Sequence, residues 1–526
     1  LGEEDQTRLK EINQRLSELR VEFGRNLLAE TNGYKLVIED EADLAGLPGA
    51  VVETAAATAH RDGLESAWVF TTHKPSMLPF LTYSEDRDLR ERLYAAYTVR
   101  GNQNNEYDNK AAIAEIINLR VEKARLLGYE TFAHYTLEPR MAGTPDKVRE
   151  LLDQLWEASL PVAKREVTQM QAIIDSEGGG FKLAPWDWWF YAEKLRKATY
   201  DLDDNDLRPY FEINNVRDGV FYVANQLYGL TFEELEDMPK PHPDAQVFEV
   251  FEADGSHAAV IYMDYHPRES KRGGAWCGRF RSQNRANGTE VDPVINLVCN
   301  FTTATEDTPA LLSLDEARTL FHEFGHALDG MLSNVTYRTT VRSPDFGELP
   351  SQIMEHWAVA PEVLKVYARH YETGEPIPDE LIAKIENSSF FNQGFSQVEV
   401  LAASLLDMEY HALTAPTELD VNVFEKTYFD EIGLIPEIVS RYRTTYFSHI
   451  TGGYAAGYYG YTWSGVLDHD AFAAFEETSL FDQETANRFR TEILEVSGSK
   501  DYMDMWIAFR GREPEIGPLL RNLGLL

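Results

Sequence analysis

The sequence predicts a mainly α-helical protein that contains one small β-sheet. Apolar residues recur every three or four positions through most of the chain, which is the spacing of one helix face. The strongest strand-like apolar runs lie within residues 247–299. The chain has 526 residues, of which 43% are apolar, so it can bury a large core.

The first predicted helix runs from Glu3 to about Thr31, and Gly33 suits its end. Its apolar residues form one stripe: Leu9, Ile12, Leu16, Leu19, Phe23 and Leu27. The stripe lasts only about three heptads, so we expect it to pack inside the molecule rather than form a coiled-coil dimer. Further helices are predicted at about residues 41–61, 84–99, 109–127 and 144–176.

Three strands are predicted in the middle of the chain. Val247–Phe251 and Ala258–Tyr265 flank the turn residues Asp254-Gly255, which indicates a hairpin. Val294–Cys299 is a third apolar run. The stretch 271–276 between them is predicted as a flexible basic loop, and the chain returns to helices after the third strand.

A capped helix is predicted to begin near Leu314, because Ser313 and Glu316 have the spacing of a capping box. Within this helix lies the sequence His-Glu-Phe-Gly-His, residues 322–326. His322 and His326 fall on one face a single turn apart, so they can bind one zinc ion. Glu323 can then reach a water on that ion. The alternative is a pair of core histidines with Glu323 as their partner.

A third zinc ligand is expected from residues 344–355, which offer Asp345, Glu348 and Glu355. Glu348 opens a helical run toward His370, and we predict that it is the ligand. Glu355 comes seven residues later, about 20° away around a helix, so we expect it behind the ligands. An acidic residue in the first helical turn is also a common partner of the helix dipole.

The stretch 449–461 begins with His449 and places four tyrosines among glycines. We predict a mobile loop rich in hydrogen-bond donors. Amide hydrolysis passes through an oxyanion that needs such donors, and one donor contributes about 3 kcal/mol. The alternative is an aromatic core segment, which the density of glycines disfavours.

Together, the motifs at residues 322–326, 345–352 and 449–461 resemble the thimet oligopeptidase family of zinc peptidases. Within it they are most similar to the bacterial peptidyl-dipeptidases, also called dipeptidyl carboxypeptidases. Four shorter stretches fit that subgroup as well: residues 186–188, 271–276, 442–443 and 446–447. The resemblance covers nearly the whole chain.

The resemblance implies a two-lobed helical ellipsoid that encloses a deep substrate channel, with the small sheet next to the zinc helix. It implies that residues 1–526 form a single peptidase unit. Residues 1–200 would be mostly an N-terminal helical lobe, and residues 201–526 the catalytic region. Family members usually carry a further helical segment before the equivalent of Leu1, so this chain is expected to be a fragment or one part of a cleaved enzyme.

The resemblance also implies one zinc ion per chain, in the gluzincin arrangement of an HExxH motif and a glutamate. His322, His326 and Glu348 would be the ligands and Glu323 the general base. The other implied site residues are His449 and Tyr461 as catalytic groups, Tyr454, Tyr458 and Arg443 as substrate contacts, and Glu355 behind the ligands. Two positions depart from the family pattern without removing a ligand, since Gly347 replaces a common valine and Asp329 a common histidine.

The expected activity is hydrolysis of short peptides with release of C-terminal dipeptides. That activity requires a cation for the substrate's terminal carboxylate. Arg443, Arg441, Arg279 and Lys271 are the candidates, although each is also explained as a partner of the chain's own carboxylates. The alternatives are an endo-acting oligopeptidase with the same zinc centre and a non-catalytic peptide-binding protein, which would ordinarily lose a ligand or the base.

The charge balance restricts the partners. The chain has 49 Lys and Arg against 87 Asp and Glu, a formal net charge of −38, which repels nucleic acid and anionic membranes. Cys277 and Cys299 are the only cysteines, which favours a reducing compartment. We expect the cytoplasm, with the periplasm as the alternative. No signal peptide is visible, and no apolar run reaches the roughly 18 residues of a membrane span.

Overall fold

The computed structural model describes residues 1–200, 203–268, 271, 274–304, 308–338, 343–496 and 498–525. The protein is mainly helical with a small sheet, as predicted. The chain divides into two compact units. Unit 1 comprises Leu1–Thr199, Phe391–Tyr459 and Leu525, and unit 2 comprises Tyr200–Phe390 and Gly460–Gly524.

Unit 1 is built from helices and one two-stranded antiparallel sheet. Its helices are α1 (Glu3–Gly33), α2 (Gly49–Arg61), α3 (Lys74–Tyr83), α4 (Arg87–Thr98), α5 (Lys110–Leu126), α6 (Phe132–Leu137), α7 (Pro145–Ser176), α8 (Trp188–Tyr200), α16 (Gln393–His411) and α17 (Val421–Glu431). Its strands are β1 (Lys35–Ile38) and β2 (Trp68–Thr71).

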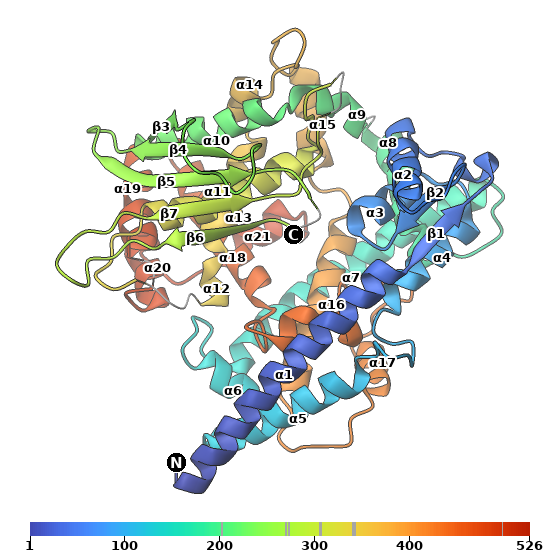
Figure 1. Cartoon of the computed structure of the whole chain (residues 1–526), viewed down its shortest axis with the longest axis horizontal. Coiled ribbons are helices and arrows are strands. Elements are labelled where there is room, and N and C mark those ends of the chain that lie inside the picture. Colours follow the sequence, from blue (N-terminus) through green and yellow to red (C-terminus); the bar gives the residue numbers. More distant parts are fainter. Residues whose placement is uncertain are drawn as a thin grey trace. The chain divides into compact units, whose positions relative to one another are not determined.

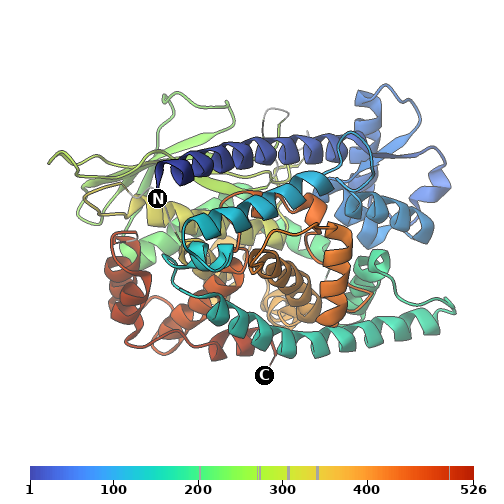
Figure 2. The same cartoon turned by 90° about the horizontal axis from the view of Figure 1, so that it is seen from below.

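The predicted N-terminal stripe packs inside unit 1. Helix α1 runs alongside α5 (Figures 1 and 2) and buries Ile12, Leu19 and Phe23. Two bidentate ion pairs also join the helices, Arg8 with Glu122 and Arg15 with Glu115. The stripe therefore belongs to the monomer's core rather than to a dimer seam.

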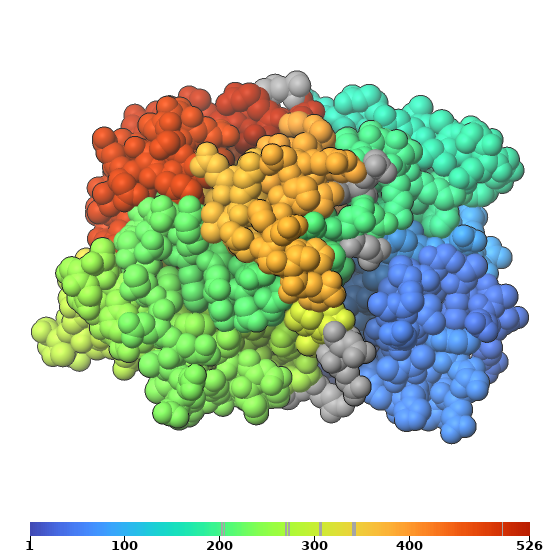
Figure 3. Space-filling view, turned by 90° about the horizontal axis from the view of Figure 1, so that it is seen from above, coloured from blue at the N-terminus to red at the C-terminus, as the bar shows by residue number. Residues whose placement is uncertain are grey.

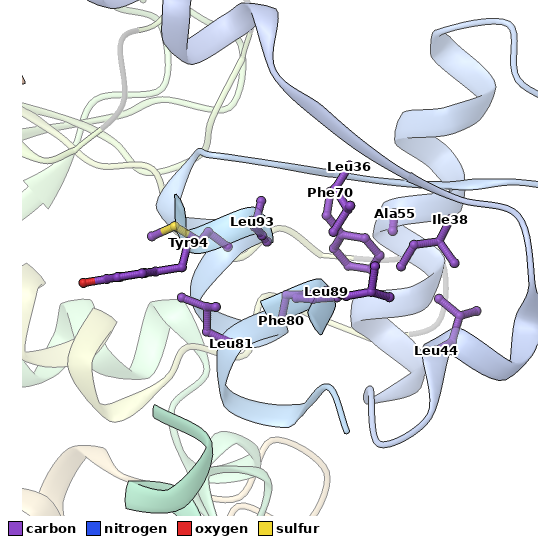
Figure 4. Packing of buried hydrophobic residues seen from close by; sticks show 11 residues of the cluster. Leu36, Ile38, Leu44, Ala55, Phe70, Phe80, Leu81, Leu89, Leu93 and Tyr94 are labelled. Carbon is purple, nitrogen blue, oxygen red and sulfur yellow. The ribbon is translucent and has the colours of Figure 1, made fainter. Parts of the chain in front are cut away.

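The helix predicted at residues 41–61 is wrong in its first half. A short 3₁₀ turn spans Glu41–Leu44, and α2 begins only at Gly49. Pro48 disfavours helical backbone at the residue before it, and Gly46 adopts φ +84°. Strands β1 and β2, helices α2 to α4 and the segments between them enclose a compact apolar cluster that includes Leu36, Phe70 and Phe80 (Figure 4).

The segment Phe391–Tyr459 belongs to unit 1 because α16 packs closely against α7. A side chain at Gly394 would place its Cβ 2.3 Å from the backbone nitrogen of Ala163, so only glycine allows this approach. Glu166 of α7 accepts hydrogen bonds from the backbone N–H groups of Gly394 and Phe395, both at 2.9 Å. Burial raises the pKa of Glu166 to about 7.

Unit 2 contains a five-stranded sheet and the remaining helices. Its strands are β3 (Thr231–Glu234), β4 (Gln246–Phe251), β5 (His257–Asp264), β6 (Trp276–Arg281) and β7 (Val294–Val298). Its helices are α9 (Asp204–Leu207), α10 (Ile213–Tyr228), α11 (Leu314–Met331), α12 (Pro344–Gly347), α13 (Leu349–Val359), α14 (Pro361–Tyr367), α15 (Asp379–Ser388), α18 (Gly460–Glu476), α19 (Gln483–Phe489), α20 (Tyr502–Arg510) and α21 (Gly517–Asn522).

The sheet of unit 2 has the order β3-β4-β5-β7-β6, with only β5 and β7 parallel (Figure 1). The three predicted strands correspond to β4, β5 and β7, and the hairpin turn at Asp254-Gly255 is present. Strands β3 and β6 of this sheet were not predicted, nor were β1 and β2 of unit 1. Strand β6 lies at one edge of the sheet, and α11 packs against β5, β6 and β7. Residues 272 and 273 of the predicted basic loop lie outside the described residues.

Helices α9, α10, α14 and α15 lie next to one another in unit 2 (Figure 3). Figure 3 shows the segment of α14 and α15 beside that of α9 and α10. Phe211 and Arg369 form a parallel bridge between these segments. Among the described residues, every helix is too short or too polar to cross a membrane.

Candidate metal centre

Helix α11 begins where the sequence predicts. Ser313 Oγ accepts a hydrogen bond from the backbone N–H of Glu316 (3.1 Å), and the Glu316 carboxylate accepts one from the backbone N–H of Ser313 (2.8 Å). The apolar stripe of this helix is buried: Ala317, Leu320, Phe321, Phe324, Leu328 and Met331. This anchoring fixes the rotation of the helix, and with it the direction of the histidines.

His322, His326 and Glu348 converge in unit 2. Glu348 Oε2 lies 3.4 Å from His322 Nε2 and 3.1 Å from His326 Nε2. One ligand atom of each residue lies within 4.8 Å of the others, so the three can hold one metal ion. Two imidazole nitrogens and one carboxylate oxygen are the donor set of a catalytic zinc site that keeps one position open.

Glu348 reaches this position because it precedes α13. The short helix α12 ends at Gly347, and Glu348 is the N-cap residue of α13. The helical run predicted toward His370 is interrupted, since α13 ends at Val359 and α14 begins at Pro361. Asp345, the other early candidate, is buried and accepts a hydrogen bond from Ser343 Oγ.

Gly325 brings α11 and α13 together. A Cβ at Gly325 would lie 2.0 Å from the carbonyl oxygen of Pro350 and 2.6 Å from Cα of Ser351. Real Cβ atoms do not approach backbone so closely, so any other residue would force the helices apart. The glycine between Glu323 and His326 therefore sets the distance between the histidines and Glu348.

Glu355 orients His322 from behind. Its Oε1 lies 2.8 Å from His322 Nδ1, and its Oε2 lies 3.2 Å from an Nη of Arg318. Burial acts to raise the pKa of Glu355, but the contacts with His322 and Arg318 outweigh it and lower the pKa. An ionised Glu355 holds the His322 proton on Nδ1 and leaves Nε2 available to a metal.

Glu323 stands beside the histidines and is only 5% exposed. Burial raises its pKa, against the opposing effect of His322 and His326. Its Oε2 has no hydrogen-bond partner among the described residues. A buried carboxylate with one unused oxygen next to a metal-binding group can accept a proton from water, so the residues present fit a catalytic metal ion.

His449, Tyr454 and Tyr458 form a separate cluster in unit 1. His449 lies in a 3₁₀ turn, Ser448–Thr451, and its ring centroid is 5.8 Å from that of Tyr454 and 5.3 Å from that of Tyr458. Burial and the positive charge of Arg441 lower the pKa of His449 to about 4. The imidazole is therefore neutral near pH 7 and can donate a hydrogen bond.

The segment after His449 is anchored, whereas the sequence predicted a mobile loop. The carboxylate of Asp407, on α16, accepts hydrogen bonds from three successive backbone N–H groups, those of Ala456 (2.9 Å), Gly457 (2.8 Å) and Tyr458 (2.9 Å). Arg120 donates to the carbonyl of Ile450. Sequence reasoning missed Asp407, although an acidic residue within the largely apolar run 400–408 was a visible signal.

The remaining predicted site residues are Tyr461 and the four candidate cations for the substrate's terminal carboxylate. Tyr461 lies in the first turn of α18 in unit 2, where its backbone carbonyl accepts a hydrogen bond from Gln352 Nε2 (3.3 Å). Each candidate cation contacts a carboxylate of the chain: Arg443 with Glu425 (2.7 Å), Arg441 with Glu399 (3.3 Å), Arg279 with Asp329 (3.3 Å) and Lys271 with Asp264 (3.0 Å).

The chain matches the model of peptidase family M3 over residues 80–525. Dipeptidyl carboxypeptidase of Escherichia coli (strain K12) is 40% identical over 532 residues, which cover 100% of this chain and 78% of that protein. Oligopeptidase A of the same strain is 38% identical and covers 100% of this chain and 79% of its own length. Saccharolysin of Saccharomyces cerevisiae is 27% identical, and the match covers 100% of this chain and 76% of that protein.

A solved structure shares the fold. The crystal structure of a protein described as oligoendopeptidase F superposes with a TM-score of 0.55 and 15% sequence identity, and the match covers 100% of this chain and 76% of that one. At this identity the likeness concerns the fold alone.

Proposed function

The chain belongs to peptidase family M3 and is a metallopeptidase, and from this premise we propose that it releases dipeptides from the C-terminal end of short peptides with the help of one zinc ion. The observation that carries this proposal is the convergence of His322, His326 and Glu348, with Glu323 buried beside them. A non-catalytic binding protein would have no reason to keep all four residues in this arrangement.

The proposed ligands are His322, His326 and Glu348, and Glu355 keeps His322 in the right tautomer. A bound zinc ion would supply Lewis acidity toward water and the scissile carbonyl. Glu323 accepts the proton of the attacking water and returns it to the leaving amine.

Three tyrosines and one histidine are proposed to act on the substrate. Tyr461 and His449 donate hydrogen bonds to the oxyanion, and Tyr454 and Tyr458 hold the peptide. We also propose the two-lobed arrangement around a substrate channel that the family resemblance implies, with the chain acting as one peptidase unit. The free thiols of Cys277 and Cys299 support the proposal of a reducing, cytoplasmic location.

An endo-acting oligopeptidase is the second candidate, because oligopeptidase A matches this chain almost as well as dipeptidyl carboxypeptidase does. The two differ in whether the terminal carboxylate of the substrate is recognised. Arg443 is our proposed contact, and Arg441 is the alternative because its charge acts directly on His449 and Tyr458. Products of one peptide with a free and an amidated C-terminus, identified by mass spectrometry, separate the candidates. Cleavage of the amidated peptide at an undiminished rate excludes dipeptide release as the main activity.

Replacement of Glu323 tests the catalytic assignment. Glu323→Gln keeps the size of the side chain but cannot accept a proton, so kcat should fall by about 10²–10⁴-fold. The zinc content should stay at the wild-type level because Glu323 is not a ligand, whereas His322→Ala should lose the zinc ion of the catalytic centre and the activity with it. An active Glu323→Gln enzyme with ordinary turnover would refute the assignment.

A further inference from the structure

A second group of potential metal ligands lies in unit 2, on α13 and α18. His356, Asp468 and His469 each offer a ligand atom within 4.8 Å of the other two. None of them belongs to the centre formed by His322, His326 and Glu348. The proposed peptidase reaction also leaves all three residues without a role.

The geometry of this group is that of two imidazoles around one carboxylate. His356 Nε2 lies 3.4 Å from Asp468 Oδ1, and His469 Nδ1 contacts the same oxygen. The two imidazole centroids are 4.7 Å apart, with their planes 84° to each other. His356 stacks on Phe472 at 4.4 Å and 9°, which holds its ring in place. The ligand atoms are therefore positioned before any ion arrives.

The buried carboxylate of this group faces two imidazoles, and the negative charge of Glu355 also acts on both imidazoles. Asp468 is 4% exposed, and within the described part of the chain its ion-pair partners are His356 and His469. Burial opposes ionisation of Asp468, but the two imidazoles overcome this and lower its pKa, and Asp468 in turn raises the pKa of His469. The negative charge of the buried Asp468 carboxylate is thus balanced by a proton on His469 Nδ1. The same nitrogen lies 2.8 Å from the carbonyl oxygen of Gly465.

A divalent cation can replace that proton. Imidazole and carboxylate ligands bind metals in their deprotonated forms, so an ion that enters such a group releases a proton and takes over its charge. Two nitrogens and one oxygen favour zinc and its neighbours among the transition metals over magnesium or calcium, which prefer oxygen ligands.

We propose that His356, Asp468 and His469 form a second site for a zinc-class divalent cation, separate from the catalytic centre. The two sites share α13, because His356 follows Glu355, which hydrogen-bonds His322 of the first site. Occupancy of the second site does not depend on the proposed peptidase reaction.

Metal stoichiometry tests this proposal without any activity assay. The full chain is dialysed against buffers of fixed free zinc, and zinc per chain is measured by mass spectrometry. We expect about two ions for the wild type and about one for His469→Ala. His322→Ala should also bind about one ion, because it loses the first site and keeps the second. His257→Ala is the control, since it removes another histidine that lies beside carboxylates, and it should keep two ions.

Two results would overturn the proposal. One is a single ion per wild-type chain at saturating zinc, and the other is a His469→Ala protein that still binds two ions. Asp468→Asn provides a second test that keeps the volume of the buried side chain. If either variant melts well below the wild type without zinc, its stoichiometry is measured far below that melting temperature. If the proposed catalytic centre did not bind zinc, His322→Ala would instead have the same zinc content as the wild type.

Discussion

Glu348 and Asp468 show how single buried carboxylates organise this molecule. Each lies against two imidazoles, but only the first set could be read from the sequence. His322 and His326 are four residues apart on one helix, so their proximity follows from helix geometry. His356 and Asp468 lie on different helices and come together only through tertiary packing. Glu348 was predicted in preference to Asp345 because it opens the helical run that follows, and the family resemblance implied the same ligand.

The histidine at position 449 should make stability depend on pH. Its folded pKa is about 4, below the ordinary value near 6.5, because of burial and Arg441. The unfolded chain therefore binds the extra proton more readily. The stabilising contribution is complete above about pH 6.5 and is lost as the pH falls toward 4. Between pH 7 and pH 5 the free energy of unfolding should fall by about 2 kcal/mol from this group alone.

Urea unfolding of the wild type and His449→Gln at both pH values measures this contribution. The loss of stability on acidification should be smaller in the variant, since glutamine does not titrate. Equal losses in the two proteins would show that His449 does not carry the effect. The comparison is needed because the chain's many carboxylates also respond to acid.

At the scale of elements, the close contact between α11 and α13 is the feature most sensitive to a small change. Gly325→Ala would place a methyl group within 2.0 Å of the Pro350 carbonyl oxygen. We expect a loss of about 1–3 kcal/mol in stability from overpacking. Zinc affinity should also fall, because the helices that carry the histidines and Glu348 must separate. Chemical unfolding and zinc titration against a competing chelator measure the two effects.

Gly24→Ala is the control for this substitution. Gly24 lies in α1, and a methyl group added there would meet no neighbouring atom within 4 Å, so alanine should stabilise the helix by about 0.5–1 kcal/mol. Zinc affinity should be unchanged. A Gly325→Ala protein that binds zinc as tightly as the wild type would show that the two helices can adjust without moving the ligands.

Asp407 connects α16 to the tyrosine segment that follows His449. Asp407→Asn removes the charge that three backbone N–H groups now share, so stability should fall by about 3 kcal/mol. Ala456 has φ +47°, an unfavourable conformation that these hydrogen bonds help to hold. Displacement of Tyr454 and Tyr458 should lower kcat/KM by about 10²-fold.

Asp420→Asn is the matched control, because Asp420 accepts two backbone N–H groups at the start of α17, away from this segment. It should alter stability slightly and leave kcat/KM unchanged. If Asp407→Asn were folded and fully active, the anchoring of the tyrosine segment would not matter for catalysis. Peptide hydrolysis measured far below the melting temperature separates this effect from unfolding.

A helix or strand could be predicted from the sequence where its own residues determine its conformation. Helices α1, α5, α7 and α11 and strands β4, β5 and β7 carry complete apolar patterns, and all were predicted. Strand β6 has no alternating apolar pattern, so no local signal predicts it. Its extended conformation depends on pairing with β7. The helix expected at residues 41–61 failed because Gly46 and Pro48 override an otherwise suitable pattern.

At the scale of the whole molecule, the return of residues 391–459 to unit 1 had no local signal. It depends on Gly394 fitting against Ala163 and on Glu166 binding the start of α16, which are contacts between distant parts of the chain. Composition, in contrast, acts on the entire molecule and can be read directly. The excess of acidic residues gives the chain a strongly negative net charge.

The net charge of −38 should make stability rise with ionic strength. Repulsion among surface carboxylates is weaker in the expanded unfolded chain, so it lowers the free energy of unfolding. Salt screens this repulsion over about 10 Å at 0.1 M. The melting temperature should therefore increase by several degrees between about 0.05 and 0.5 M sodium chloride, most steeply at the low end.

A variant in which the exposed residues Glu53, Glu157 and Glu476 become glutamine should respond less steeply, because it carries less charge of the same sign. A melting temperature that stays constant or falls with salt would mean that local ion pairs, rather than net repulsion, dominate the electrostatics of this chain.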